Sequence, residues 1–440
     1  MWNVINASCG PKHHFFGFHD LIAFNKSDDK ILSLEVDVIN HPPLPGEKAR
    51  VGYVNLSDHN FVSLGTTNAF NYPQGARQQW ISNEMFIVNN QIGEKWGADI
   101  YDVSLGCKID SFDAACHSLS KDGKKAFGLN YSRLHRLGGY GYTGIDDFTI
   151  DENIPSDDGI YITDLASKET KLLVSIMDVA SCGEELNTVK GCQHYLTHIC
   201  VSPNNQRLAF LHRFILSDGG LRTRLMTIGI DGTDLRCLAE GFLSHFDWKD
   251  SDTLFIYGRL NTAVDTLRTC AIFNSHVFSG FAKNVKNIIR PFLRKSMSGK
   301  MSFMLIEDKL SGEIKKVAEG IITSDGHPMF SPINNDLIIC DTYPSEDKYR
   351  ELFLYDFKLN RRMEIGRFKM LDELVDESMS KQYLLGVDPN VLRNVVSPST
   401  LGFTRSGLHC DLHPRWNFSG TKIAFDSIHE GTRQIYVCKV

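Results

Sequence analysis

The chain repeats a short sequence motif, called the histidine phrase below, in which a histidine occupies the same position each time. In each copy it is followed three residues later by a hydrophobic residue, then by a turn and a strand. The four clearest copies begin at His198, His245, His327 and His413. Imidazole changes charge near neutral pH and is a common metal ligand. If the fold brings these positions together, the sequence predicts a site for proton transfer or metal binding.

A divalent metal ion is one expected occupant of this histidine cluster. Asp411 stands two residues before His413, and His327 starts the preceding copy of the phrase. Imidazole nitrogens and carboxylate oxygens without thiolate spacing favour Mn, Zn or Ca. We therefore take His327, Asp411 and His413 as the candidate metal ligands. The alternative is structural, with each histidine bonded to the backbone of a neighbouring repeat.

Cations and phenols are concentrated in the middle of the chain. They are Arg133, His135, Tyr140, Tyr142, His194, Tyr195, His198, Arg213, Arg222 and Arg224. Arginine binds a planar carboxylate through two parallel hydrogen bonds, and tyrosine and histidine can pass a proton. This combination suits an acidic sugar polymer. For Tyr140 and Tyr142 the alternative is packing in an ordered loop, whereas Arg213 lies in an apolar strand, where a charge needs a partner or a ligand.

The elements that would position these residues are short strands. Period-two alternation bounded by turn residues occurs at 50–58, 98–103, 159–167, 224–232, 302–308, 352–357 and 434–438. The histidine phrase also finds seven places once weaker copies at 18–24, 78–80 and 116–123 are admitted. Four-stranded units repeated seven times predict an all-β, seven-bladed β-propeller. A pair of β-sandwiches is the competing architecture, but it does not explain the count of seven.

Closure of the ring is expected to involve both ends of the chain. The last unit shows only three strands, at about 413–418, 421–426 and 433–439, and Trp2–Ile5 would supply the fourth. This N-terminal strand exchange would leave no long open edge. Residues 1–440 are therefore predicted to form a single β-propeller domain. The histidines, at the start of the innermost strands, would converge on the central channel.

Two segments interrupt the repeat. Residues 276–300 contain six Lys and Arg residues and are predicted to be a basic helical insertion, either solvated or in contact with an acidic polymer. Residues 368–407 include Asp388 and Pro389, which suit an N-cap and a first helical position. We expect a second helical insertion there, covering one face of the ring.

Composition limits the function classes. The 440 residues are 42% hydrophobic and 23% charged, as in a soluble globular protein, and the net charge of −6 does not favour nucleic acid as a partner. No stretch approaches the ~20 apolar residues of a membrane helix. The first residues lack the pattern of a signal peptide, which predicts a cytoplasmic location; the alternative is an exported protein from which the signal has been trimmed.

Motifs that are absent narrow the choice further. The eleven cysteines are scattered without a Cys-x-x-Cys pair, which is typical of reduced, buried thiols. The sequence has no Gly-x-Ser-x-Gly elbow, no phosphate-binding Gly-Lys-Ser/Thr loop and no convincing dinucleotide fingerprint. A serine hydrolase, a dehydrogenase and any enzyme with a nucleotide cofactor are therefore disfavoured.

Several of these segments resemble the seven-bladed propeller polysaccharide lyases and their uncharacterised relatives. They are residues 13–20, 130–133, 139–142, 194–198, 212–213, 222–224, 326–328, 341–344, 410–416 and 429–436. Ulvan lyases are the nearest characterised members, and oligogalacturonate lyases are more distant. The resemblance spans nearly the whole chain apart from the two insertions.

The resemblance implies cleavage of a uronic acid unit by β-elimination. In those families an Arg, a His or a metal neutralises the carboxylate, and a Tyr or His takes the C5 proton. Carried over to this sequence, Tyr195 would transfer the proton and Arg213 would hold the carboxylate. His117, His135, His194 and His198 would assist them. The expected substrate-binding residues are Arg133, Tyr140, Tyr142, Arg222, Arg224 and His245.

The predicted function is thus a lyase that acts on an acidic oligo- or polysaccharide. One alternative is a non-catalytic propeller that binds an acidic glycan or a protein through the same face. Another is a glycoside hydrolase, which needs paired carboxylates about the scissile bond. Asp146, Asp147, Asp157 and Asp158 are available, but nothing in the sequence marks a pair among them.

Overall fold

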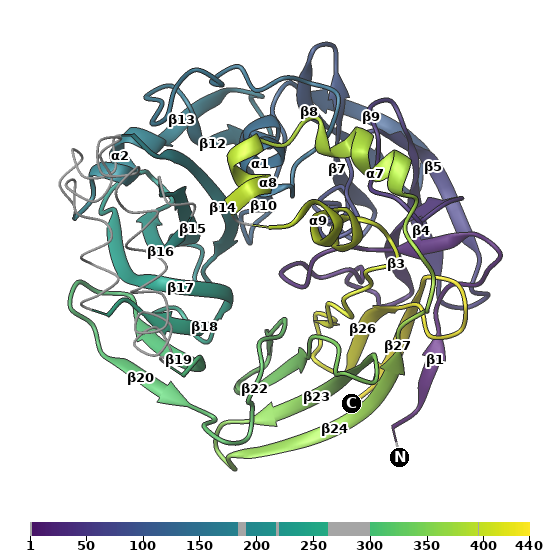
Figure 1. Ribbon diagram of the computed structural model, residues 1–440. Helices are drawn as coiled ribbons and strands as arrows, with labels where there is room; N and C mark the ends of the chain where they lie inside the picture. The colour runs from purple at the N-terminus through teal and green to yellow at the C-terminus, as the bar shows by residue number, and fades with distance from the viewer. Residues whose placement is uncertain (1, 184–190, 217–219, 263–299, 395) are drawn as a thin grey trace.

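The chain forms a ring of seven four-stranded antiparallel blades, seen along the ring axis in Figure 1. The computed structural model describes residues 2–183, 191–216, 220–262, 300–394 and 396–440. In each blade the first strand lies toward the axis and the last strand lies at the rim. The predicted seven-bladed β-propeller is confirmed.

The first three blades are built from consecutive strands. They are β2 (His13–Phe15), β3 (Lys30–Val36), β4 (Ala49–Asn55) and β5 (Phe61–Thr67); β6 (Gln79–Trp80), β7 (Met85–Ile92), β8 (Lys95–Asp102) and β9 (Cys107–Phe112); and β10 (Ser118–Leu119), β11 (Lys125–Gly128), β12 (Gly159–Asp164) and β13 (Thr170–Ser175). The inner strands are the shortest, because the ring narrows toward its axis.

The fourth and fifth blades share a strand. They comprise β14 (Gln193–Val201), β15 (Arg207–Ile215), β16 (Leu221–Gly229), β17 (Arg236–Trp248), β18 (Thr253–Leu260), β19 (Ser302–Glu307) and β20 (Ile314–Val317). The first part of β17 pairs with β16 as far as Gly241, and the part from Gly241 onward pairs with β18. One continuous strand is therefore the rim of one blade and the inner strand of the next.

The last two blades complete the ring. They are β21 (Met329–Ser331), β22 (Asn334–Asp341), β23 (Tyr349–Asp356) and β24 (Arg361–Lys369), followed by β25 (Arg415–Trp416), β26 (Lys422–Ser427), β27 (Gln434–Lys439) and β1 (Val4–Asn6). Strand β1 pairs antiparallel with β27, from Val4 opposite Cys438 to Asn6 opposite Tyr436. The predicted closure by an N-terminal strand is confirmed.

Buried polar side chains join neighbouring blades. Asn89 accepts a hydrogen bond from the Cys116 amide at 2.7 Å, and Asp341 accepts one from the His413 amide at 3.1 Å. In the same way Asp426 accepts the Phe16 amide at 3.3 Å. Each of these amides belongs to the inner part of the next blade, where it would otherwise be buried without a partner. The hydrogen bonds therefore fix how far each inner strand reaches toward the axis.

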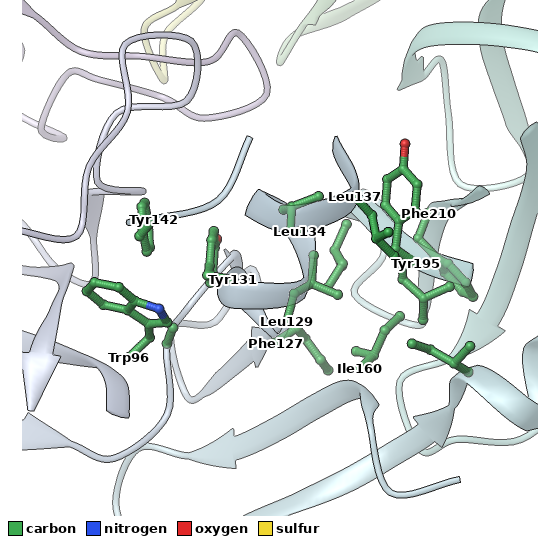
Figure 2. Packing of buried hydrophobic residues seen from close by; sticks show 14 of the residues in the cluster. Trp96, Phe127, Leu129, Tyr131, Leu134, Leu137, Tyr142, Ile160, Tyr195 and Phe210 are labelled. Carbon is green, nitrogen blue, oxygen red and sulfur yellow. The ribbon is translucent and has the colours of Figure 1, made fainter. Parts of the chain in front are cut away.

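A helix in the third blade packs its apolar face into the core. Helix α1 (Tyr131–Gly138) begins at Asn130, whose side chain accepts the Arg133 amide, and ends at Gly139 in the left-handed conformation. Its buried residues meet apolar side chains of blades two to four (Figure 2). A second short helix, α2 (Ile176–Ser181), follows β13 and begins with a capping box at Ser175.

The predicted insertion at 368–407 contains three helices, α7 (Glu377–Leu384), α8 (Pro389–Asn394) and α9 (Pro398–Arg405). They lie across one face of the ring (Figure 1), and α8 begins with the expected cap, in which Asp388 accepts the Asn390 amide. The predicted insertion at 276–300 lies outside the described residues, except for Lys300. No described helix is long and apolar enough to cross a membrane.

The insertion is anchored on the C-terminal end of α1. The Tyr383 hydroxyl donates to the carbonyl of Gly139 at 3.0 Å, and the Arg405 guanidinium donates to that of Gly138 at 3.1 Å. The Asp388 amide donates to the carbonyl of Arg136 at 2.9 Å. The last carbonyls of a helix have no partner within it, so these bonds both complete α1 and hold the insertion over the ring.

Candidate functional site

The repeated histidines meet at the ring axis, packed around one phenyl ring. Phe18 lies in the loop after β2, and its ring centroid is 5.0 Å from that of His198, 6.1 Å from His245, 6.0 Å from His327 and 5.0 Å from His413. Neighbouring imidazoles also touch: the centroids of His245 and His327 are 4.2 Å apart. Four blades thus contribute one histidine each to a single cluster.

Local backbone distortions aim these side chains inward. His198 has a φ of +59° and His413 a φ of +42°, in the left-handed region that non-glycine residues rarely adopt. In β14 the pairing with β15 skips from Thr197 to Cys200, so His198 stands in a bulge. Bulges commonly redirect a side chain next to a functional site. The strain at both residues is consistent with a functional position.

His327, Asp411 and His413 form a possible metal site. All three are buried, and one ligand atom of each lies within 4.8 Å of the others. The His413 Nδ1 donates to the Gly17 carbonyl at 2.9 Å, which leaves the lone pair on Nε2. The His327 Nδ1 lies 2.8 Å from a carboxylate oxygen of Asp341. Carboxylates and carbonyls that fix the outer nitrogen are the usual second partners of metal-bound histidines.

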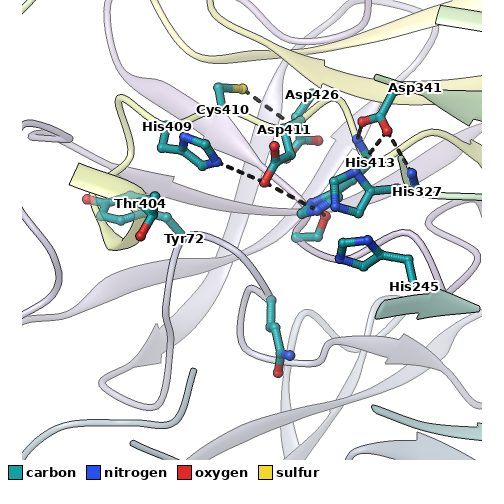
Figure 3. Close-up of polar contacts among 12 residues, drawn as sticks. Tyr72, His245, His327, Asp341, Thr404, His409, Cys410, Asp411, His413 and Asp426 are labelled. Carbon is teal, nitrogen blue, oxygen red and sulfur yellow. Dashed lines mark hydrogen bonds and ion pairs between the residues drawn. The ribbon is translucent and has the colours of Figure 1, made fainter. Parts of the chain in front are cut away.

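The charges around this group fit a divalent cation. Burial raises the pKa of Asp411, but Arg350 and His409 lower it by a larger amount. The pKa of Asp411 therefore lies well below its usual range. Burial and the neighbouring His327 hold the pKa of His413 well below its usual value, so its ring is neutral. Two imidazole nitrogens and one carboxylate suit Mn or Zn better than Ca, which takes oxygen ligands. These three residues could hold such an ion (Figure 3).

A second histidine has the arrangement of a general base. The His245 Nδ1 lies 3.1 Å from a carboxylate oxygen of Asp325. The pKa of Asp325 is lowered: burial raises it, but His245 and His327 outweigh that effect. The ionised carboxylate holds the proton on Nδ1, so that Nε2 keeps a lone pair for a substrate proton. His245 therefore stands beside the possible metal site with its basic nitrogen oriented.

The other side of the cluster is phenolic and cationic. Tyr195 and Arg213 face each other across β14 and β15. Burial raises the pKa of Tyr195, and Arg213 offsets this only in part, so the hydroxyl keeps its proton near neutral pH. The Tyr140 ring lies 6.2 Å from that of His198. The Arg405 guanidinium, from α9, stacks 3.7 Å above the Tyr140 centroid.

The remaining predicted site residues lie away from this cluster or are held by other contacts. Arg133 donates to the carbonyls of His194, Thr149, Glu152 and Asn153. Tyr142 stacks on Tyr131 at 4.3 Å in the core. His135 packs against Tyr383 of α7, and burial lowers its pKa to about 4.

A separate buried pair lies further along β14 and β15. Nδ1 of His194 and Nε2 of His212 are 2.8 Å apart, and one of these nitrogens donates to the other. Arg224 donates to the Val179 and Cys182 carbonyls, and Arg222 donates to the Asn261 side chain at 2.8 Å.

His117, by contrast, lies beside the histidine cluster. It is near enough to His198 to lower the pKa of His198.

Several residues at the axis or next to it were missed by sequence reasoning. They are Phe18, His19, Gln74, Asp325, Asp341, Arg350 and His409. The spacing Asp325-Gly-His327 is a signal that could have been used, because it matches Asp411-Leu-His413. Phe18 and His19 lie in the weak first copy of the phrase, where the register shifts. Gln74 carries no sequence signal of its own.

Buried polar atoms without a hydrogen-bond partner are concentrated at this site. In the described part of the chain they include both ring nitrogens of His19, both amide atoms of Gln74, Nε2 of His413, Nε2 of His117, Nδ1 of His409 and Nε of Arg213. A buried polar atom that stays unpaired is destabilising, and native proteins leave few of them. Their concentration here indicates that a ligand, an ion or ordered water belongs at the axis.

No family model matches the chain, and no curated protein sequence matches it significantly. Solved structures do match. An oligogalacturonate lyase from Vibrio parahaemolyticus aligns with 99% of this chain and 93% of its own, at 11% identity and a TM-score of 0.58. An oligogalacturonate lyase in complex with manganese aligns over the same shares, at 12% identity and a TM-score of 0.57.

At these identities the comparison shows a shared fold. The chain is a β-propeller similar in structure to oligogalacturonate lyases. The closer resemblance to ulvan lyases stays a prediction. Propellers carry many unrelated functions, so the function must be argued from the site.

Proposed function

We propose that the protein is a lyase that cleaves a uronic-acid-containing oligo- or polysaccharide by β-elimination. The observation that carries the proposal is the oriented base His245, with Asp325 behind it, next to the three possible metal ligands His327, Asp411 and His413. The proton to be removed is weakly acidic and lies next to a carboxylate. Its removal needs a base and, close to that base, a positive charge.

The residues divide the reaction as follows. The C5–H bond breaks and Nε2 of His245 takes the proton, while Asp325 stabilises the resulting imidazolium. The electron pair forms the C4–C5 double bond, and the C4–O bond to the leaving sugar breaks. The protonated hydroxyl of Tyr195 would donate its proton to the leaving oxygen, and Arg213 would bind the anionic substrate. A divalent ion at His327, Asp411 and His413 would neutralise the uronate carboxylate.

The substrate class is supported by charge and by the fold. The cationic and neutral donors of the site (Arg213, Arg350 and the histidines) suit a carboxylated sugar, and the two matching structures are lyases of oligogalacturonate by name. Mn or Zn is the proposed metal, since the donor set suits these ions and one of those structures holds manganese.

The test is a screen of uronate polymers and oligomers for the ultraviolet absorbance of an unsaturated uronate product. His245→Asn should abolish the product and leave the melting temperature near that of the unchanged protein. Tyr195→Phe should slow the reaction about a hundredfold. Binding without product would favour the non-catalytic propeller, and new reducing ends without absorbance would favour a glycoside hydrolase. Either result would contradict the proposal.

A further inference from the structure

His19 at the axis and Gln74 beside it bury side-chain polar atoms that make no well-formed hydrogen bond within the described residues. His19 and Gln74 are each 1% exposed, and they are the only described residues of which two side-chain polar atoms are both buried and unpartnered. A buried amide without partners costs about 1–3 kcal/mol, and a buried imidazole is comparable. Neither role proposed so far, the base or the metal ligands, makes use of these atoms.

The position of His19 places these atoms in the site. Its ring centroid is 5.4 Å from that of His327, 6.1 Å from His245 and 6.1 Å from His413. A neutral imidazole offers one N–H donor and one acceptor nitrogen.

Gln74 lies directly against the loop that carries His19. Gly17, two residues before His19, has a φ of +123°, and a Cβ there would lie 2.6 Å from the backbone of Gln74. The Gly17 carbonyl accepts from His413 at 2.9 Å, so this close contact borders the possible metal site. Any residue other than glycine at position 17 would push the two loops apart.

The backbone of Gln74 is fixed without help from its side chain. The Asn71 carboxamide accepts the Gln74 amide at 2.7 Å and donates to the Tyr140 carbonyl at 2.7 Å. Backbone hydrogen bonds between Asn71 and Gly75 close the turn. The turn therefore fixes the backbone of Gln74, while both polar atoms of its side chain are left without a partner in the described part of the chain.

Gln78, four residues further along, shows what a structural glutamine does here. It is also 1% exposed, but its Nε2 donates to the Phe16 carbonyl at 2.6 Å and its Oε1 accepts the Ala76 amide at 3.1 Å. The same connection between blades thus contains one glutamine with both amide atoms bonded and one with neither. This contrast separates a packing role from a ligand-binding role.

We propose that His19 and Gln74 are specificity-determining residues, which bind neighbouring hydroxyl groups of the sugar unit at the ring axis. Each side chain can present a donor together with an acceptor, as a pair of hydroxyls requires. A metal ion would use the amide oxygen alone and leave the amide N–H groups unpaired. The inference rests on the proposed function, because it names how that site recognises its sugar.

The test uses a matched pair of variants, Gln74→Met and Gln78→Met. Without ligand, Gln74→Met should raise the melting temperature by about 2 °C, because it removes two unpaired polar atoms with little change of shape. Gln78→Met should lower it, because it leaves the Phe16 carbonyl and the Ala76 amide unpaired. A fall for Gln74→Met as large as that for Gln78→Met would overturn the inference.

The second measurement is the shift in melting temperature with galacturonate, glucuronate, galactose and glucose. At least one sugar should stabilise the unchanged protein, and Gln74→Met and His19→Phe should each weaken its binding about tenfold. Gln74→Glu keeps the acceptor and loses the donor, so it should bind the sugar as poorly as Gln74→Met. Binding equal to that of the unchanged protein in Gln74→Glu would point to a metal ligand instead and would overturn the inference.

Lyase kinetics separate this inference from the proposed function. If a substrate is cleaved, Gln74→Met should raise KM about tenfold and leave kcat within about threefold. An active lyase whose KM is unchanged in both variants overturns the inference and leaves the function standing. Sugar binding that the variants weaken, in a protein without lyase activity, supports the inference and contradicts the function. If none of the four sugars stabilises the unchanged protein, the inference is overturned.

Discussion

The chemistry of three histidines at the axis depends on the partner of Nδ1, the ring nitrogen that faces away from the site. Nδ1 of His245 faces Asp325, that of His327 faces Asp341, and that of His413 donates to a backbone carbonyl. In each ring the acceptor fixes the proton on the outer nitrogen and leaves the inner one with a lone pair. A carboxylate also supports a positive charge, whereas a carbonyl supports it less. The rings backed by aspartate therefore suit proton uptake better than His413 does.

Replacing Asp325 should show whether His245 is the base. In Asp325→Asn the side chain can donate to Nδ1, which favours the tautomer with the proton on the inner nitrogen. We expect kcat on a cleaved substrate to fall roughly a thousandfold with little change in KM. Asp110→Asn, which removes an exposed pair with Lys168, is the control and should leave kcat unchanged. An unaltered kcat in Asp325→Asn would contradict the role of His245.

Metal content tests the group formed by His327, Asp411 and His413. Purified protein should contain close to one equivalent of Mn or Zn, and His413→Ala should lower that content at least tenfold. His429→Ala, at a histidine in the same blade that contacts Ser427, should keep the metal. Removal by a chelator should abolish activity if the ion is catalytic, and should lower the melting temperature if it is structural. Less than about a tenth of an equivalent would rule out this site.

The register of the phrase was enough to predict the histidine cluster, but not its partners. His198, His245, His327 and His413 share a sequence position, and the ring repeats that position around its axis. Phe18 and Arg350 reach the axis outside this register, so no period points to them. Their role depends on how neighbouring blades meet, which the sequence of one blade does not encode.

At the scale of elements, the insertion and α1 form one unit over the ring. The carbonyls of Gly138 and Gly139 accept hydrogen bonds from Arg405 and Tyr383, and the Arg405 guanidinium also stacks on Tyr140. The helices of the insertion could be predicted from caps such as Asp388-Pro389. Their docking site could not, because it depends on unpaired carbonyls at the end of a helix more than 200 residues earlier.

Removing the Arg405 side chain should loosen the insertion. Arg405→Ala loses the stacking on Tyr140 and the hydrogen bond to Gly138, which together contribute about 1–3 kcal/mol. Limited proteolysis within residues 368–407 should therefore be about ten times faster, because the docked state becomes less populated. Lys381→Ala, at an exposed position of α7, is the control. Equal cleavage rates in the two variants would show that Arg405 does not hold the insertion down.

The strand shared by blades four and five is the element that sequence reasoning described least well. Only its second part was recognised, as the histidine phrase at His245, and the part from Arg236 to Gly241 was not predicted. The sequence analysis did not predict that one strand would run from Arg236 to Trp248 without a turn and pair in two blades. Gly241 is the residue at which pairing changes from β16 to β18.

For the whole molecule, the ring depends on its closing blade. Val4 to Asn6 pair with β27, and the Ala7 amide donates to the Ile435 carbonyl. Deletion of residues 1–10 removes the outer strand of this blade and exposes the edge of β27. We expect aggregation, or a melting temperature lower by about 5 °C or more. Removal of Val440 alone is the control, and unchanged melting after the longer deletion would contradict closure by β1.

Acid should unfold the protein through its buried histidines. Burial, with nearby cations in some cases, holds the pKa values of His19, His117, His198 and His212 well below 6.5 and that of His135 at about 4. The unfolded chain binds more protons below pH 6.5, so stability is complete above that pH and is lost as pH falls toward 4. Each histidine lowers the unfolding free energy by up to about 1.4 kcal/mol per pH unit.

Urea denaturation at pH 7.5, 6.0 and 5.0 measures this loss. The unfolding free energy should fall steeply below pH 6.5, and His135→Gln should make the fall shallower. A free energy that stays constant between pH 7.5 and 5.0 would show that these rings are not held neutral by the fold.

The shared strand β17 also limits how the chain order could be rearranged. Because Val4 pairs with Cys438, a short linker between the two ends would turn the chain into a covalent circle, and new ends could then be opened elsewhere. Loops between other blades are suitable places for such a circular permutation, since a cut there breaks no sheet. A cut between blades four and five would divide a strand that belongs to two sheets at once. The ring looks sevenfold in space, yet its blades are not equally separable along the chain.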